Sequence, residues 1–107
     1  MDNTFLQSYR LGGKDRYSAK RVLRPVNFIV HAPEAKNVCV IGDFNDWTPG
    51  AHPLTRLPDG GWHTQILLNH GHHQYLFLID GKPTLDPKAQ GIGRNIKNER
   101  VSVIAVS

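Results

Sequence analysis

The sequence predicts an all-β domain of the β-sandwich type, and three observations support this. Several short segments alternate between apolar and other residues with a period of two, which is typical of half-buried strands. Turn-forming residues separate these segments, and no segment after residue 25 has a useful helical period. Short strands at this spacing are typical of a β-sandwich. The predicted strands cover residues 26–31, 38–41, 62–68, 72–79 and 101–106.

The first predicted strand places Val26, Phe28 and Val30 on one face. A turn over residues 32–37 follows, and the β-branched run at 38–41 ends at Gly42. Because residues 43–53 are rich in Asn, Asp, Pro and Gly, they are predicted to form a loop.

The second half of the chain begins with the turn Pro58–Gly61, after which Trp62 opens a strand in phase with Ile66 and Leu68. This phase predicts a buried Trp62, and Tyr75 and Phe77 are predicted to be buried in the same way. Asp80-Gly81 has the composition of a hairpin turn. Residues 86–98 are polar and contain glycine, so they are predicted to form a longer loop.

Charge divides the 107-residue chain into two predicted parts. Residues 1–25 hold six basic and two acidic residues, whereas residues 26–107 hold seven of each sign. We therefore expect a basic N-terminal arm over 1–25, partly ordered or packed on the domain, and the sandwich over 26–107. Such an arm could contact nucleic acid or an acidic partner. Because apolar and small residues interrupt its charges, we favour a lead-in segment and consider nucleic acid an unlikely partner.

Composition argues against several classes of protein. There is no run of roughly 20 apolar residues that would span a membrane, and no secretory signal is apparent at the start. The single cysteine, Cys39, allows no internal disulfide, so we expect a cytoplasmic protein. His70, His72 and His73 lie close in sequence, but neighbouring strand residues point to opposite faces. We therefore predict no metal site, and we expect no cofactor.

Catalysis is not expected either. The aspartates after residue 25 all lie in predicted turns or loops, where Asp is favoured because its side chain hydrogen-bonds to the backbone. No recognisable motif places a carboxylate pair for glycoside hydrolysis, and no nucleophile or phosphate-binding motif is present. The sequence therefore predicts a binding domain and not an enzyme.

The densest group of candidate binding residues is the segment Val40–Trp47. It joins a strand end to aromatic and short polar side chains in a loop. A flat indole such as that of Trp47 complements the apolar face of a sugar ring, and the polar neighbours could bind hydroxyl groups. The alternative is that Phe44 and Trp47 fold back and close the end of the sandwich. Residue type favours this alternative for Phe44 and leaves Trp47 open.

Several segments in register resemble family 48 carbohydrate-binding modules. This family includes the glycogen-binding domain of the AMP-activated protein kinase beta subunit and the N-terminal domains of isoamylases and glycogen branching enzymes. The resemblance covers residues 26–106 and implies an immunoglobulin-like (early-set) β-sandwich. It is carried by Phe28–Ala35, by Gly42–Trp47 with Pro53-Leu54, by Gly61-Trp62, and by Gly71–Gly81 with Asp86-Pro87.

The resemblance also implies a sugar site, and this chain keeps only part of it. The aromatic position of the Gly-x-Phe-Asn-x-Trp motif is Trp47, but Leu76 stands where the family commonly has lysine. Pro83 stands where a second tryptophan is common, and Asn95 or Asn98 corresponds to an asparagine before the last strand. The predicted carbohydrate-binding residues are Asn45, Asp46, Trp47, Leu54 and Asn95.

Two functions follow from these observations. The first is a non-catalytic recognition module for an α-glucan such as glycogen, starch or a maltooligosaccharide, which it would bind weakly. The second is a protein-interaction or regulatory domain that has lost the sugar site, with a partner such as a glycoside hydrolase or a kinase. The Gly42–Trp47 motif favours the first function, whereas Leu76 and Pro83 favour the second.

Overall fold

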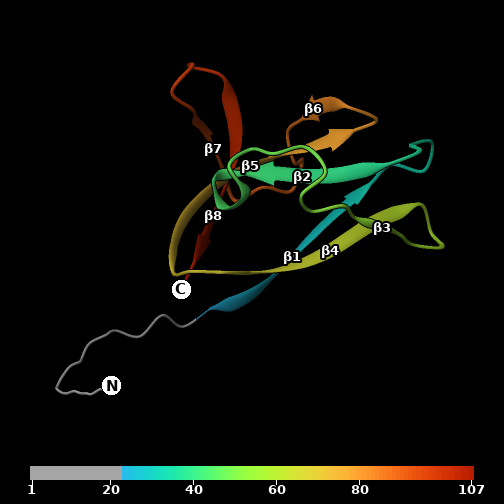
Figure 1. Ribbon diagram of the computed structural model, residues 1–107, viewed down its shortest axis with the longest axis horizontal. Coiled ribbons are helices and arrows are strands. Elements are labelled where there is room, and N and C mark those ends of the chain that lie inside the picture. Colours follow the sequence, from blue (N-terminus) through green and yellow to red (C-terminus); the bar gives the residue numbers. More distant parts are fainter. Residues whose placement is uncertain (1–22) are drawn as a thin grey trace, which may run out of the picture.

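A computed structural model describes residues 23–107, which form two layers of antiparallel strands (Figure 1). Most of the predicted N-terminal arm, residues 1–22, lies outside the described residues. The elements are β1 (Arg24–His31), β2 (Val38–Gly42), the short 3-10 helix η1 (Asp43–Asn45), β3 (Thr55–Arg56), β4 (Gly61–Leu68), β5 (Gly71–Ile79), β6 (Lys82–Thr84), β7 (Gly91–Arg94) and β8 (Arg100–Val106).

The two sheets have the arrangement of an immunoglobulin-like β-sandwich. One sheet has the strand order β1-β4-β3, and the other has the order β2-β5-β8-β7 with β6 also paired to β5. In Figure 1 the β1–β4 pair lies below the β2–β5 pair. The predicted fold class is therefore confirmed. In the described part of the chain η1 is the only helix, and none there is long and apolar enough to cross a membrane.

The core lies between the sheets and follows the alternation in the sequence. Phe28 on β1 and Phe77 on β5 point inward, and their exposed fractions are 2% and 0%. Tyr75 lies between them, with its ring centroid 5.0 Å from that of Phe28 and 5.9 Å from that of Phe77. The predicted burial of Tyr75 and Phe77 is confirmed. Edge-on aromatic pairs at these distances add to the free energy gained by burying the rings.

Trp62 is buried, as predicted, and the structure shows what fixes it. Its exposed fraction is 6%, and its indole Nε1 donates to the carbonyl oxygen of Ala32 at 2.9 Å. The Arg56 guanidinium lies 5.5 Å from the ring centroid and donates to the carbonyl oxygens of Pro33 and Ala35. Trp62 thus joins β4 to the turn after β1 with both its apolar surface and its one donor.

The β5–β6 hairpin contains the two-residue turn that the sequence predicts. Asp80 and Gly81 have φ angles of 51° and 83°, which suit a turn that needs left-handed backbone at both positions. The Asp80 carboxylate accepts hydrogen bonds from the backbone N–H groups of Asn37 and Lys36, which hold its pKa below the ordinary value. These bonds fix the hairpin to the β1–β2 turn, and they thereby fix the position of Pro83 in β6.

A hydrogen-bonded group anchors the segment that follows β6. The Tyr75 hydroxyl donates to Asp86 Oδ2 at 2.6 Å, and the Asp86 backbone N–H donates to Ser102 Oγ at 2.9 Å. Burial raises the pKa of Tyr75 above its ordinary value, and the hydrogen bond and charge of Asp86 raise it further. The phenol therefore stays protonated at neutral pH and remains a donor.

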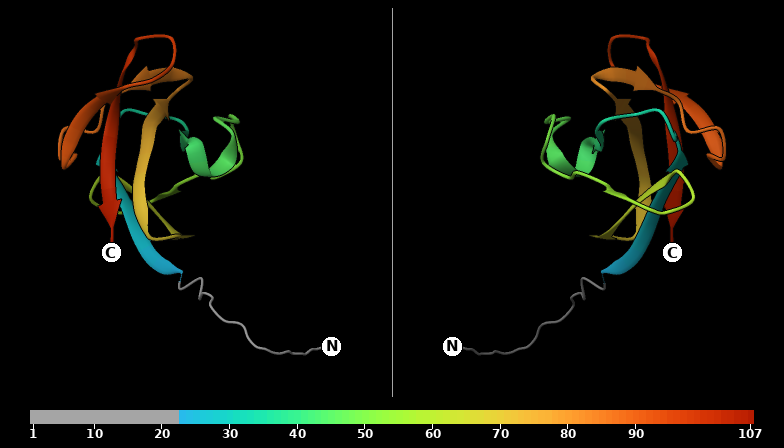
Figure 2. Two further views of the ribbon diagram at one scale, coloured as in Figure 1. Left: turned by 90° about the vertical axis from the view of Figure 1, so that its left-hand side faces the viewer. Right: turned by 90° about the vertical axis from the view of Figure 1, so that its right-hand side faces the viewer.

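The predicted loop over residues 86–98 is wrong for part of its length, because Gly91–Arg94 forms strand β7 paired with β8. The segment resembles a loop because it contains glycines, and one of them, Gly93, is needed for packing. A Cβ atom on Gly93 would lie 3.0 Å from Val103 Cγ2, which leaves little space for a side chain. Strand β7 thus lies at the edge of the five-stranded sheet, next to β8 (Figure 2).

Candidate functional site

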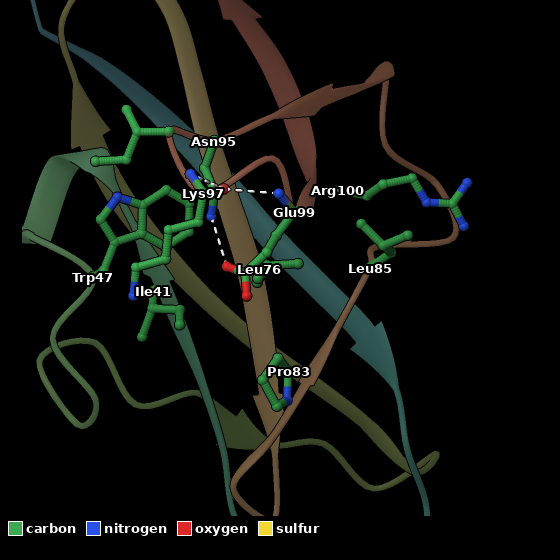
Figure 3. A pocket seen from close by; sticks show the side chains of 10 residues that line it. Ile41, Trp47, Leu76, Pro83, Leu85, Asn95, Lys97, Glu99 and Arg100 are labelled. Carbon is green, nitrogen blue, oxygen red and sulfur yellow. Dashed lines mark hydrogen bonds between the residues drawn. The ribbon is translucent and has the colours of Figure 1, made fainter.

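A groove of about 500 Å³ opens on the outer side of the five-stranded sheet. In Figure 2 the loop after β2 and the β7–β8 hairpin lie on opposite sides of β5. Residues from all three of these segments line the groove. Ile41 of β2 and Leu76 of β5 line it centrally, and Pro83 and Leu85 line its far end (Figure 3). The remaining lining residues are Trp47 from the loop after β2 and, from the β7–β8 turn and the start of β8, Asn95, Ile96, Lys97, Glu99 and Arg100; Figure 3 shows Asn95 and Lys97 beside Trp47.

Trp47 reaches the groove through an unusual backbone path. After η1, Asp46 and Trp47 have φ angles of 55° and 56°, so two consecutive side-chain-bearing residues are left-handed. This conformation costs about 1–2 kcal/mol per residue for L-amino acids. The Trp47 backbone N–H donates to the Gly42 carbonyl oxygen at 2.9 Å, which closes the loop. Strain of this kind persists where the surrounding structure enforces it, and it is frequent at binding sites.

Asp43 ties this loop to strand β5. Its Oδ2 accepts the backbone N–H of Gln74 at 3.0 Å, and its Oδ1 lies 3.1 Å from His73 Nδ1. A carboxylate that accepts both contacts cannot rotate freely, so η1 is held against β5. The position of Trp47, four residues further on, therefore depends on Asp43.

Asn45 braces the loop from within. Its Oδ1 accepts the Gly42 backbone N–H at 3.0 Å, and its Nδ2 donates to the Val40 carbonyl oxygen at 3.1 Å. The Nδ2 atom also lies 2.9 Å from His52 Nδ1. With these three contacts the carboxamide stabilises the loop and does not line the groove.

Asn95 organises the β7–β8 turn. Its Oδ1 accepts the backbone N–H groups of Lys97 and Glu99, both at 2.9 Å. Its Nδ2 donates to Glu99 Oε1 at 3.0 Å (Figure 3). An amide nitrogen carries two hydrogens, and among residues 23–107 the Asn95 Nδ2 atom donates only to Glu99.

The structure brings together two of the five predicted site residues. Trp47 and Asn95 both line the groove, and Trp47 is half-buried there. Asn45 supports the loop, and the exposed Asp46 is absent from the groove lining. Leu54 belongs to the core with an exposed fraction of 6%. Phe44 packs against the core, in agreement with the interpretation that this ring closes the end of the sandwich.

Sequence reasoning missed most of the groove's other residues. Leu76 and Pro83 were singled out only as departures from the family pattern, and both line the groove. Ile96, at the tip of the β7–β8 turn, is a fully exposed aliphatic residue. A search of the sequence for apolar residues in predicted loops could have found it. Nothing in the sequence singled out Lys97, Glu99 or Arg100, because charged residues are common in turns and at strand ends.

The groove has the chemistry of a binding site. Aliphatic and indole surfaces line it, and polar groups lie along the side formed by the β7–β8 turn. Its lining includes one carboxylate, Glu99, whereas glycoside hydrolysis ordinarily uses a pair. Within residues 23–107 no three His, Cys, Asp or Glu side chains are grouped as a metal ion would need.

Comparison with known proteins identifies the relatives of this sandwich. A 1,4-alpha-glucan branching enzyme of Deinococcus radiodurans is 43% identical over 56 residues, which cover 52% of this chain and 8% of that protein. A 1,4-alpha-glucan branching enzyme of Xanthomonas campestris is 37% identical over 73 residues, which cover 64% of this chain and 10% of that protein. The chain thus matches at most about a tenth of the length of these two relatives.

The family comparison covers far more of the chain. The family described as carbohydrate-binding module 48 (isoamylase N-terminal domain) matches residues 16–97, which is well over half of the sequence. The matched range contains every strand from β1 to β7 and all of the groove's lining except Glu99 and Arg100. This agrees with the resemblance seen in the sequence motifs. The chain belongs to the carbohydrate-binding module 48 family.

Proposed function

We propose that this chain is a non-catalytic module that recognises an α-glucan in the groove beside Trp47. The observation that carries the proposal is the half-exposed indole, which is held in strained backbone geometry and faces an open groove. An indole gives a sugar ring an apolar face to stack on, and the remaining Asn95 amide hydrogen is a donor for a hydroxyl. The relatives named as 1,4-alpha-glucan branching enzymes support an α-glucan as the ligand. A cytoplasmic location is part of the same proposal.

The affinity should be low, because the groove offers one aromatic platform. Aromatic stacking contributes about 1–3 kcal/mol per ring, by analogy with nucleic-acid bases. Leu76 and Pro83, at the positions where the family commonly has lysine and tryptophan, add apolar contact but no donor. One stacked ring together with a hydroxyl hydrogen bond of about 1 kcal/mol would supply about 4 kcal/mol at most, which corresponds to a dissociation constant near 1 mM. We therefore expect millimolar binding of a single short chain, and stronger retention on a polymer.

The test is a titration of the full chain with maltoheptaose, followed by NMR, beside retention on insoluble amylose. Trp47→Ala should weaken binding about tenfold or more, because the platform is lost. Leu67→Ala is the matched control, since Leu67 is exposed on β4 and lies outside the groove. Cellohexaose is the control for the linkage. Equal binding by wild type and Trp47→Ala would contradict the proposal.

A second candidate function is protein interaction through the same groove. The observation that favours it is the aliphatic lining formed by Ile41, Leu76, Pro83 and Leu85, which would suit an apolar side chain. A catalytic domain that acts on glucans, or a kinase, is the kind of partner this candidate implies. The double variant Leu76→Lys with Pro83→Trp separates the two candidates. If wild type binds no α-glucan and the folded double variant also fails, the interaction function is the better one.

A further inference from the structure

Lys97 lines the same groove as Trp47, although the two residues come from different segments of the chain. Lys97 lies in the turn between β7 and β8, where its backbone N–H donates to Asn95 Oδ1 at 2.9 Å. Two further backbone bonds close this turn, from the Asn95 N–H to the Glu99 carbonyl oxygen at 3.0 Å and from the Asn98 N–H to the Asn95 carbonyl oxygen at 2.9 Å. The Lys97 side chain therefore starts from a fixed point at the groove.

Within residues 23–107, no protein group holds the Lys97 ammonium away from the groove. The hydrogen bond that Lys97 donates there comes from its backbone N–H. The one ion pair in this part of the chain joins His73 to Asp43. An ammonium group has three donor hydrogens and no acceptor, so its natural partners are oxygen atoms.

The groove beside Lys97 is apolar. The Trp47 indole lines it together with Ile41 and Leu76, and Figure 3 shows Lys97 beside Trp47. A pyranose ring has apolar C–H faces and a rim of hydroxyl groups, so it needs both an apolar surface and a hydrogen-bonding group at the edge of that surface. Binding sites for small molecules commonly combine an apolar lining with a few polar groups that orient the ligand. Trp47 and Lys97 together have this combination.

Arg100 is the other basic residue in the groove lining, and it is placed differently. It begins strand β8, whereas Lys97 belongs to the turn before that strand. In the view of Figure 3 the Arg100 side chain lies near Leu85 and points away from Trp47. Of these two cationic side chains, Lys97 is therefore the one beside the indole.

We propose that Lys97 is a ligand-binding residue of the groove, whose ammonium donates to the hydroxyl rim of the sugar ring that stacks on Trp47. This inference rests on the proposed function and adds a second contact residue from another segment. Each glucose unit of an α-glucan keeps a pair of neighbouring hydroxyl groups, which offer oxygen acceptors to one ammonium group. An apolar peptide side chain offers none, and covering a charged donor without an acceptor lowers affinity. Lys97 thus favours a sugar over an apolar peptide as the occupant of the groove.

The test is a maltoheptaose titration of the full-length protein, followed by NMR. Lys97→Met keeps an unbranched apolar side chain but removes the donors, so affinity should fall about fivefold, the equivalent of one hydrogen bond. Lys97→Arg keeps a cationic donor and should bind more tightly than Lys97→Met. Lys88→Met is the matched control, because Lys88 is exposed and lies outside the groove, and it should bind as the wild type does.

Each other outcome has a definite meaning. Wild-type affinity in Lys97→Met would overturn the role of Lys97 and leave the proposed function standing. Tighter binding by Lys97→Met would overturn it as well, because the side chain would then cover the indole and hinder the ligand. Equally weak binding by Lys97→Met and Lys97→Arg would show that the donor is not what matters. If the wild type binds no maltoheptaose, the proposed function itself fails, and the role of Lys97 fails with it.

Discussion

Trp62 and Trp47 are the two tryptophans of this chain, and they occupy opposite kinds of surroundings. Trp62 lies in a regular strand, is 6% exposed, and has its indole N–H bonded to a carbonyl oxygen. Trp47 lies in a loop, is half-buried, and adopts a left-handed backbone beside an open groove. The first ring contributes to folding through burial. The second is held in place at a cost in backbone energy.

The difference shows where this small domain gains stability and where it gives some up. The inner faces of β1, β4 and β5 carry apolar rings that pack together, and burial along β1 alternates with strand periodicity. The segment 43–47 breaks that regularity and needs Asp43 and Asn45 to fix it. A binding surface needs exposed apolar area, which the core avoids, so the two regions are built by different rules.

The largest expected effect is that of Trp62→Ala. Removing a buried tryptophan ring typically lowers the free energy of unfolding by about 3–5 kcal/mol, because the cavity that the ring leaves closes only partly. The change also leaves the Ala32 carbonyl oxygen without its indole donor. Urea unfolding followed by circular dichroism measures the loss. A cost below about 1 kcal/mol would mean that this ring is not a main part of the core.

A smaller effect is expected for Tyr75→Phe, which removes the hydroxyl bonded to Asp86. Hydrogen bonds to charged groups contribute about 1.5–3 kcal/mol, so a loss near 2 kcal/mol is expected at neutral pH. The raised pKa of Tyr75 adds a dependence on pH. Stability from this phenol is complete below the unfolded-state pKa of about 10 and is lost as the pH rises further. Wild type should therefore lose more stability than Tyr75→Phe between about pH 9 and 11.

The smallest effect distinguishes two substitutions of Trp47. Glycine adopts a left-handed backbone without the cost that alanine has there, so Trp47→Gly should be more stable than Trp47→Ala by about 1 kcal/mol. Both variants lose the ring equally, which makes backbone conformation the main difference between them. Paired urea unfolding curves measure it. If the alanine variant were the more stable, the left-handed φ of Trp47 would not be a strain on the folded protein.

The sequence was sufficient to predict the sandwich but only part of the groove. Alternation along β1 and β5 reports which residues face inward, since that property is local to each strand. Strand β7 was missed because Gly93 is required by the close approach of Val103, a neighbour ten residues away in sequence. Leu54 was predicted at the site because it follows a motif, whereas its side chain turns into the core. Which side chains meet across strands depends on the register of strand pairing, and a local sequence pattern does not determine that register.

Gly42 has a consequence for protein engineering. Its φ angle of −171° is open to any residue, so its requirement is one of space and not of backbone freedom. A Cβ atom there would lie 2.6 Å from both the Gln74 carbonyl oxygen and the Phe44 ring. The Phe44 ring therefore packs directly against the backbone of Gly42. A transfer of the Trp47 loop to another β-sandwich should therefore include this glycine. The recipient must also have a neighbouring strand whose backbone lies where Gln74 of β5 lies here.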